Sequence, residues 1–153
     1  MDNIEKQYRL DKAYMDTAKA LSQLSYAERA KVGCVIVNNN GQIVSQGYNG
    51  TPNGFDNKCE ENGTTKKEVL HAESNAIAKC AKWGGSTAGS TLYVTLSPCY
   101  ECAKMIRQAG ISRVVYCDTY RDTEGLQLLR RAKVSLCKIH NLQKDENDAM
   151  CKQ

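Results

Sequence analysis

The chain has 153 residues, 41% hydrophobic and 25% charged, which fits one globular domain with a sizeable core. It shows no apolar run near the ~20 residues of a membrane span and no N-terminal signal-peptide pattern, so we expect a soluble, cytoplasmic protein without a membrane partner. The net charge of +4 is spread without a basic block, and it suits a small anionic ligand as well as a nucleic acid.

The first predicted element is an amphipathic helix over residues 8–24, where apolar residues recur with a period close to 3.6. Two β-branched runs follow, VGCVIVN (32–38) and IVSQGYN (43–49), and the polar, glycine-containing turn between them predicts a β-hairpin. Residues 49–68 are rich in Gly, Asn, Thr and charge. We expect a long loop there that binds a ligand.

A second helix is predicted from His71 to the Gly84–Gly85 pair, followed by a strand at TLYVTL. Ser97 and Pro98 fit the N-cap and first residue of a third helix, which Gly110 ends. The remaining pattern is strand, helix and strand at 113–117, 123–133 and 134–139. This order predicts a three-layer α/β/α sandwich around a mixed five-stranded sheet, with an antiparallel first hairpin and parallel later strands. We expect one domain over residues 1–140 and a polar tail over 141–153.

Eight cysteines are present, and without an export signal we expect them to be reduced thiols. Cys34, Cys80 and Cys117 lie in apolar patterns and are predicted core residues. Cys99 and Cys102 are three positions apart at the start of a predicted helix, where the helix N-terminus favours thiolates. Alone, this pair fits a redox motif, a structural zinc clip or half of a catalytic site.

His71 favours the catalytic alternative. It begins a predicted helix, and Glu73 follows two positions later. A structural zinc site is normally closed by four protein ligands, and the chain has no second C-x-x-C or H-x-x-x-H to close one. Three ligands, His71, Cys99 and Cys102, leave a fourth position for water, and Glu73 can then move protons if its helix meets the metal end-on.

The joint pattern HAE and PCYEC, with His71 and Cys99 28 positions apart, is the signature of zinc nucleobase deaminases. We predict that zinc lowers the pKa of a water molecule, and that Glu73 takes the water proton and delivers protons to the ring nitrogen and the departing amine. The alternative is a structural His71 and a solvated Glu73.

From RAKVGCVIV through GYNGTPNGF, HAESNAIAKCA, LYVTLSPCYECAKMIRQAGISRVVY and YRDTEGLQLLRRAKV, the sequence resembles the deoxycytidylate (dCMP) deaminases of bacteria and their phages. The resemblance covers about residues 8–137, and GYNGTPNG is its most discriminating stretch. It implies a fold of the cytidine deaminase type and hydrolytic deamination of dCMP to dUMP, which feeds thymidylate precursor supply.

The resemblance also implies residue roles. Asn49 would hold the deoxyribose hydroxyl and Arg29 would lie near the 5′-phosphate, although a turn residue and a surface charge are the respective alternatives. Tyr120 and Arg121 are candidates for closing the phosphate side, with packing as the alternative for Tyr120. The backbone at two further residues would read the pyrimidine edge, namely Ala72 and Ser97.

Members of this family are commonly homohexamers, activated by dCTP and inhibited by dTTP, with Mg²⁺ beside the effector. The resemblance places the effector loop at Gly50, Asn53, Gly54 and Phe55. The alternative is a loop that only shields the substrate. Only one histidine, His140, remains for a second zinc site, so we expect none.

Two other functions stay open. A tRNA adenosine-type deaminase needs a basic surface with stacking aromatic residues, which a single Trp, a single Phe and scattered charges disfavour. A zinc-stabilised binding module without catalysis would have no need of Glu73. We therefore expect a small-molecule substrate and no nucleic-acid partner.

Overall fold

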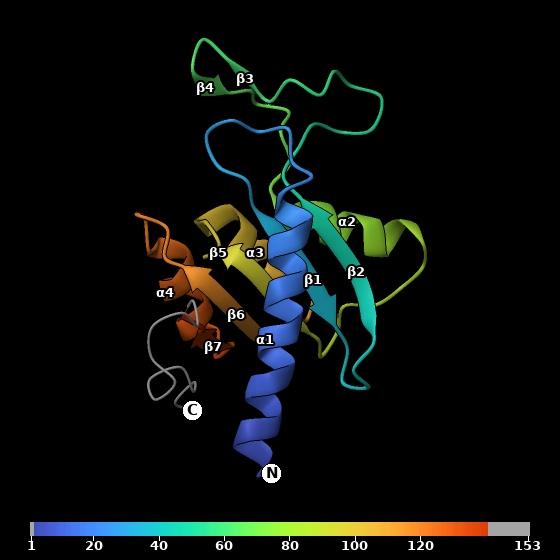
Figure 1. The fold of residues 1–153 in the computed structure, drawn as a ribbon, viewed down its shortest axis with the longest axis vertical. Coiled ribbons are helices and arrows are strands. Elements are labelled where there is room, and N and C mark those ends of the chain that lie inside the picture. Colours follow the sequence, from blue (N-terminus) through green and yellow to red (C-terminus); the bar gives the residue numbers. More distant parts are fainter. Residues whose placement is uncertain (1, 141–153) are drawn as a thin grey trace.

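The computed structural model describes residues 2–140 as a five-stranded sheet in the order β2-β1-β5-β6-β7, covered by helices on both faces (Figure 1). Strands β1 (Gly33–Val37) and β2 (Ile43–Tyr48) form the predicted antiparallel hairpin. Strand β5 (Thr91–Leu96) runs antiparallel to β1, whereas β6 (Arg113–Asp118) and β7 (Ser135–Lys138) continue the sheet in parallel. The predicted mixed sheet is confirmed.

Helix α1 (Asn3–Ser22) lies along one face of the sheet (Figure 1). Its predicted start at residue 8 is too late, because the Asp2 side chain caps the helix by accepting the backbone N–H of Glu5 at 2.7 Å. The opposite face carries α2 (Ala72–Lys82), α3 (Tyr100–Gln108) and α4 (Glu124–Arg131). None of the helices in residues 2–140 is both long and apolar enough to cross a membrane.

Alternation along the strands supplies a separate core on each face. Val35, Tyr93 and Val115 pack under α1, whereas Leu92 and Val114 pack under the other three helices. The three cysteines predicted as core residues are indeed buried, namely Cys34, Cys80 and Cys117. Helices therefore cover both faces of the sheet, so we expect a ligand-binding site at the ends of the strands.

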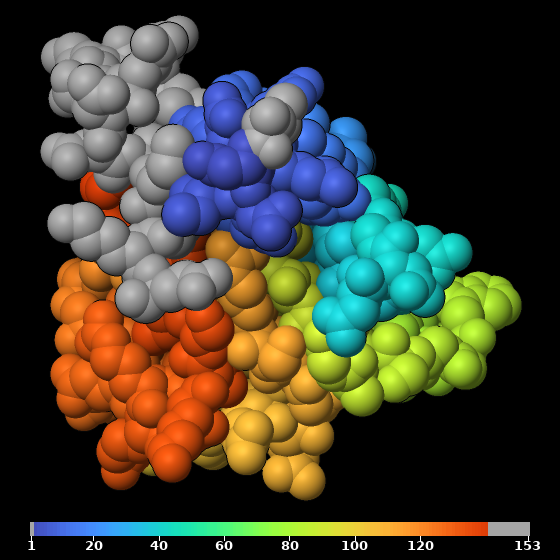
Figure 2. Space-filling model, turned by 90° about the horizontal axis from the view of Figure 1, so that it is seen from below, coloured from blue at the N-terminus to red at the C-terminus, as the bar shows by residue number. Residues whose placement is uncertain are grey.

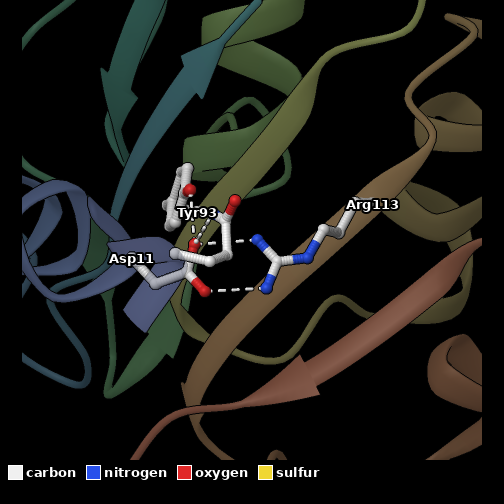
Figure 3. A network of polar contacts seen from close by, with 4 residues as sticks. Asp11, Tyr93 and Arg113 are labelled. Atoms are coloured by element: carbon white, nitrogen blue, oxygen red, sulfur yellow. Dashed lines mark hydrogen bonds and ion pairs between the residues drawn. The ribbon is translucent and has the colours of Figure 1, made fainter. Parts of the chain in front are cut away.

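A buried polar network fixes α1 on the sheet (Figure 3). Asp11 is only 2% exposed and lies between Tyr93 of β5 and Arg113 of β6. Arg113 donates to both carboxylate oxygens at 2.8 and 2.7 Å, and the Tyr93 hydroxyl donates to Oδ1 at 2.7 Å. Gln7 adds a fourth hydrogen bond from within α1. Burial raises the pKa of Tyr93, so its hydroxyl remains a donor.

The segment 49–70 projects beyond the end of the sheet (Figure 1). It is not the unstructured loop predicted, because it contains a small hairpin of β3 (Glu60–Glu61) and β4 (Thr64–Thr65). The turn between them is Asn62–Gly63, with both residues at positive φ, as a tight hairpin turn requires. A bridge between Gly50 and Leu70 closes the base of the segment.

The predicted N-cap of α3 is wrong. Cys99, not Ser97, caps this helix, and the Cys99 sulfur accepts the backbone N–H of Cys102 at 3.5 Å. Ser97 is used differently, because its hydroxyl accepts the backbone N–H of Tyr120 at 2.7 Å. A cap two residues later leaves the Ser97–Pro98 pair free to connect strand β5 to the helix.

At the end of the molecule seen in Figure 2, the turn of the first hairpin lies beside the connection from α2 to β5 and the end of α3. Gly89 approaches the Asn39 side chain there, and Gly110 approaches Ala88. These contacts belong to the end of the sheet opposite the 49–70 segment.

The predicted tail over 141–153 lies outside the described residues.

Candidate active site

Two helix N-termini meet beyond the carboxyl end of β5. His71 is the N-cap of α2 and Cys99 is the N-cap of α3, both with extended backbone. Cys102 follows in the first turn of α3. Because each helix N-terminus carries partial positive charge, this position stabilises thiolates.

The three side chains form a group that could hold a metal, with ligand atoms all within 4.8 Å of one another. The Nδ1 atom of His71 lies 3.4 Å from the sulfur of Cys99 and 3.4 Å from the sulfur of Cys102. A tetrahedral zinc ion, with a Zn–S distance of ~2.3 Å and a Zn–N distance of ~2.05 Å, would separate such atoms by about 3.6 Å. The donor set and its spacing therefore fit zinc with three protein ligands.

Electrostatics within the group favour a thiolate. Hydrogen bonding by the Cys102 thiol and then by His71 lowers the pKa of Cys99 to about 4. The same contact with Cys99, together with burial, raises the pKa of Cys102. The hydrogen bond to Cys99 likewise raises the pKa of His71. The two sulfurs and the imidazole thus already share protons that a metal ion would displace.

Glu73 lies in the first turn of α2 and is only 4% exposed. Burial raises the pKa of its carboxyl, whereas the neighbouring His71 opposes that shift. The Glu73 carboxyl interacts with His71 and Cys102 but is not one of the three residues of the ligand group. The end-on approach of its helix to a metal stays a prediction. A buried carboxylate in this position can take and return a proton.

The group opens into a cavity of about 270 Å³. His71, Cys99 and Glu73 lie in its wall, together with five of the predicted substrate residues. Those five are Arg29, Asn49, Ala72, Ser97 and Tyr120. Arg121 is exposed and is not in the cavity wall, so its predicted closing position is not seen in this structure.

Asn49 is held rigidly at the cavity. Its Oδ1 accepts the backbone N–H of Val32 at 2.9 Å, and its Nδ2 donates to the carbonyl of Ala30 at 2.7 Å. An amide oxygen accepts two hydrogen bonds and an amide nitrogen donates two, so one of each is left for a ligand. The structural and ligand-binding alternatives for Asn49 are therefore compatible.

The predicted effector residues lie elsewhere. Gly50, Asn53, Gly54 and Phe55 line a second cavity of about 320 Å³, formed between the 49–70 segment and α2. Aromatic side chains and lysines share this cavity, notably Tyr26, Tyr48, Lys79 and Lys82. Lys79 lies 5.5 Å above the ring of Tyr48. The loop thus contributes to a pocket separate from the metal group.

Several residues of the first cavity were not predicted from the sequence. Cys59, Glu60 and Thr65 reach it from the β3–β4 hairpin, which was predicted as loop. The Asn62–Gly63 pair is a hairpin-turn signal that could have located the hairpin. Nothing local could have indicated the contact of Glu60, because its partners lie 31 and 32 positions away.

Comparison with known proteins gives a consistent picture. Residues 8–118 match the family model for the cytidine and deoxycytidylate deaminase zinc-binding region. The deoxycytidylate deaminase of Enterobacteria phage T2 is 34% identical over 181 aligned residues, covering 90% of this chain and 96% of that protein. The mouse deoxycytidylate deaminase is 41% identical over 120 residues, covering 72% of this chain and 66% of that protein. The crystal structure of the dCMP deaminase from cyanophage S-TIM5 in complex with dCMP and dUMP has a TM-score of 0.83 and 45% identity, covering 91% of this chain and 99% of that one.

Proposed function

The chain belongs to the cytidine and deoxycytidylate deaminase family, and on that premise we propose that it hydrolyses dCMP to dUMP and ammonia. The observation that carries the proposal is one cavity whose wall includes two members of the metal group, His71 and Cys99, together with Glu73, Arg29 and Asn49. Such a cavity suits a small anionic nucleotide whose base must meet the metal group. The names of the relatives reported above support dCMP as that nucleotide.

His71, Cys99 and Cys102 would hold the catalytic zinc, one ion per chain. When bound, zinc supplies the Lewis acidity that makes a water molecule nucleophilic at neutral pH. Glu73 accepts one proton of the attacking water on its carboxylate and delivers it to the ring nitrogen, then carries the second proton from the added hydroxyl to the departing amine. One carboxylate can do both because the two transfers occur at different times. Water is consumed and ammonia is released.

The rest of the cavity would bind and orient the substrate. Arg29 would bind the 5′-phosphate and Asn49 the deoxyribose hydroxyl, using the hydrogen-bonding capacity that its backbone contacts leave. Backbone groups at Ala72 and Ser97 would read the pyrimidine edge. Tyr120, held by Ser97, would border the phosphate side. Arg121 is exposed in this structure, so it would reach the phosphate side only after the segment that carries it moves inward.

We also propose that the second cavity binds the effector nucleotide. Aromatic rings of Tyr26, Tyr48 and Phe55 can stack on a base, and Lys79 and Lys82 can meet a triphosphate with its Mg²⁺. Activation by dCTP and inhibition by dTTP would act there. A homohexamer, a single domain over residues 1–140 and a cytoplasmic location remain predictions, as does the supply of dUMP for thymidylate synthesis.

Ammonia release from dCMP by the zinc-loaded protein tests the proposal. The reaction is run without effector, with dCTP and Mg²⁺, and with dTTP, and Glu73→Ala is the control for contaminating activity. We expect turnover that rises with dCTP and falls with dTTP. Absence of turnover under every condition, with one zinc per chain confirmed, would exclude the proposed reaction. It would favour a polynucleotide deaminase or a non-catalytic zinc module.

A further inference from the structure

Three acidic residues are buried among residues 2–140, and two of them have evident tasks. Asp11 pairs with Arg113, and Glu73 lies beside the metal group. The third, Glu60, is 7% exposed and forms no ion pair with any residue in the described range. The proposed reaction gives it no role.

Glu60 uses its carboxylate to hold a distant stretch of backbone. Its Oε1 accepts the N–H of Glu28 at 2.9 Å and the N–H of Arg29 at 3.2 Å. Burial of a carboxylate is costly unless hydrogen bonds compensate it, and bonds to a charged acceptor are the stronger kind. Two consecutive amides on one oxygen therefore fix the local direction of the chain at Arg29.

The two segments joined in this way are walls of the same cavity. Ala27, Arg29 and Ala30 line it on one side, and Cys59, Glu60 and Thr65 line it from the β3–β4 hairpin. The Arg29 side chain itself is exposed and has no hydrogen bond or ion pair within residues 2–140. Its backbone is thus fixed while its guanidinium is available to a ligand.

We propose that Glu60 is a positioning residue that holds Arg29 at the phosphate end of the substrate cavity. The inference rests on the proposed function, since it takes a nucleotide phosphate as the partner of Arg29. It assigns the task to the hydrogen-bond acceptor and not to the negative charge, because a carboxylate would repel a phosphate. Glutamine retains an oxygen that can accept both amides. Alanine removes it.

Steady-state kinetics with dCMP separate these variants. We expect Glu60→Ala to raise KM by about tenfold with kcat within about twofold of wild type, because binding geometry is lost and the proton carrier is untouched. Glu60→Gln should keep KM within about twofold of wild type. Glu61→Ala is the matched control, since Glu61 is the exposed neighbour on the same strand. Equal KM values for Glu60→Ala and wild type, or a loss confined to kcat, would overturn the inference.

A double-mutant cycle tests whether the effect passes through Arg29. Arg29→Ala alone should raise KM, and adding Glu60→Ala should raise it less than about twofold further. Multiplication of the two single effects would show that Glu60 acts elsewhere.

Amide hydrogen exchange supplies a measurement that does not depend on turnover. In zinc-loaded protein without nucleotide, the amides of Glu28 and Arg29 should exchange at least about tenfold faster in Glu60→Ala than in wild type or Glu60→Gln. Equal exchange in all three would refute the positioning role whatever the kinetics. A wild-type protein inactive on dCMP would refute the proposed function, and the exchange rates would still decide what Glu60 holds.

Discussion

Two clusters of polar side chains, one between α1 and the sheet and the other beyond the carboxyl end of β5, differ in where their partners are. Under α1, Asp11 receives four hydrogen bonds, all from Gln7, Tyr93 and Arg113. At the N-termini of α2 and α3, two sulfurs and an imidazole nitrogen face one another within 4.8 Å. The first cluster is complete within the chain, whereas the second consists of electron-pair donors that a cation would complete.

We therefore expect the Asp11 cluster to stabilise the fold and the metal cluster to serve function. A buried ion pair with every hydrogen bond made holds elements together, and removing one member leaves the other charged and buried. A cluster of metal-ligating side chains contributes little to the stability of the fold until a metal binds. Substitutions in the two clusters should therefore have opposite signatures, one in unfolding and the other in metal content and turnover.

The largest effect is expected from Cys99→Ala. With one of three ligands gone, zinc should be lost from the purified protein and ammonia release from dCMP should be undetectable, because no ordinary side chain replaces a thiolate ligand. Metal analysis by mass spectrometry, together with the activity assay, measures both. Cys80→Ala, at a buried cysteine of α2 outside the cluster, should keep its zinc. Full zinc content in Cys99→Ala would remove Cys99 from the ligand set.

A smaller but still large effect is expected from Glu73→Ala. Zinc should stay at one ion per chain, while kcat falls by about 10³- to 10⁴-fold, because proton transfer is lost and the ligands are not. Single-turnover measurements on zinc-loaded protein give this ratio. Zinc retained with undiminished kcat would contradict the role of Glu73.

In the cluster under α1, Asp11→Ala should lower the free energy of unfolding by about 3 kcal/mol, because Arg113 and Tyr93 lose their shared acceptor. Chemical denaturation measures the change. Zinc per chain and the turnover of the folded fraction should remain unchanged. Asp16→Ala, which breaks the exposed Lys12–Asp16 pair on the same helix, is the control and should cost less than about 1 kcal/mol. Loss of zinc in Asp11→Ala would mean that the two clusters are coupled.

The smallest effect is expected from Ser97→Ala, which releases the backbone N–H of Tyr120 from its 2.7 Å hydrogen bond. A bond of this kind contributes about 1 kcal/mol, so KM for dCMP should rise by about fivefold with kcat nearly unchanged. Ser97→Thr, which keeps the hydroxyl, should restore most of the affinity. A rise in KM shared equally by the alanine and threonine variants would point to packing in place of the hydroxyl.

The sequence predicted the order of elements and the metal cluster because both depend on short patterns. The period of apolar residues located the helices and strands, and HAE with PCYEC brought His71 to Cys99 across 28 positions. The N-cap of α3 was predicted at Ser97 instead of Cys99, because a Ser-Pro pair is a strong local signal for a helix start. In the folded protein the Ser97 hydroxyl instead accepts the backbone N–H of Tyr120, 23 positions away.

Contacts between distant charged residues were not predictable in the same way. Any of several carboxylates could have paired with Arg113, and only the crossing of α1 over the sheet selects Asp11. In the sequence, Glu60 is one of several charged residues in a polar stretch. Only the folded β3–β4 hairpin places its carboxylate against the amides of residues 28 and 29. Burial, which distinguishes both acids from their exposed neighbours, follows from the assembled fold.

The Asp11–Arg113 pair also bears on the order of folding. The two residues are 102 positions apart, and contacts at such separation form slowly because a long loop must close first. Helix α1 is synthesised before any strand, yet the guanidinium that completes Asp11 arrives only with β6. Helix α1 can thus pack on the apolar residues of β1 and β5 before β6 exists, and its Asp11 carboxylate completes its hydrogen bonds only after β6 has been synthesised.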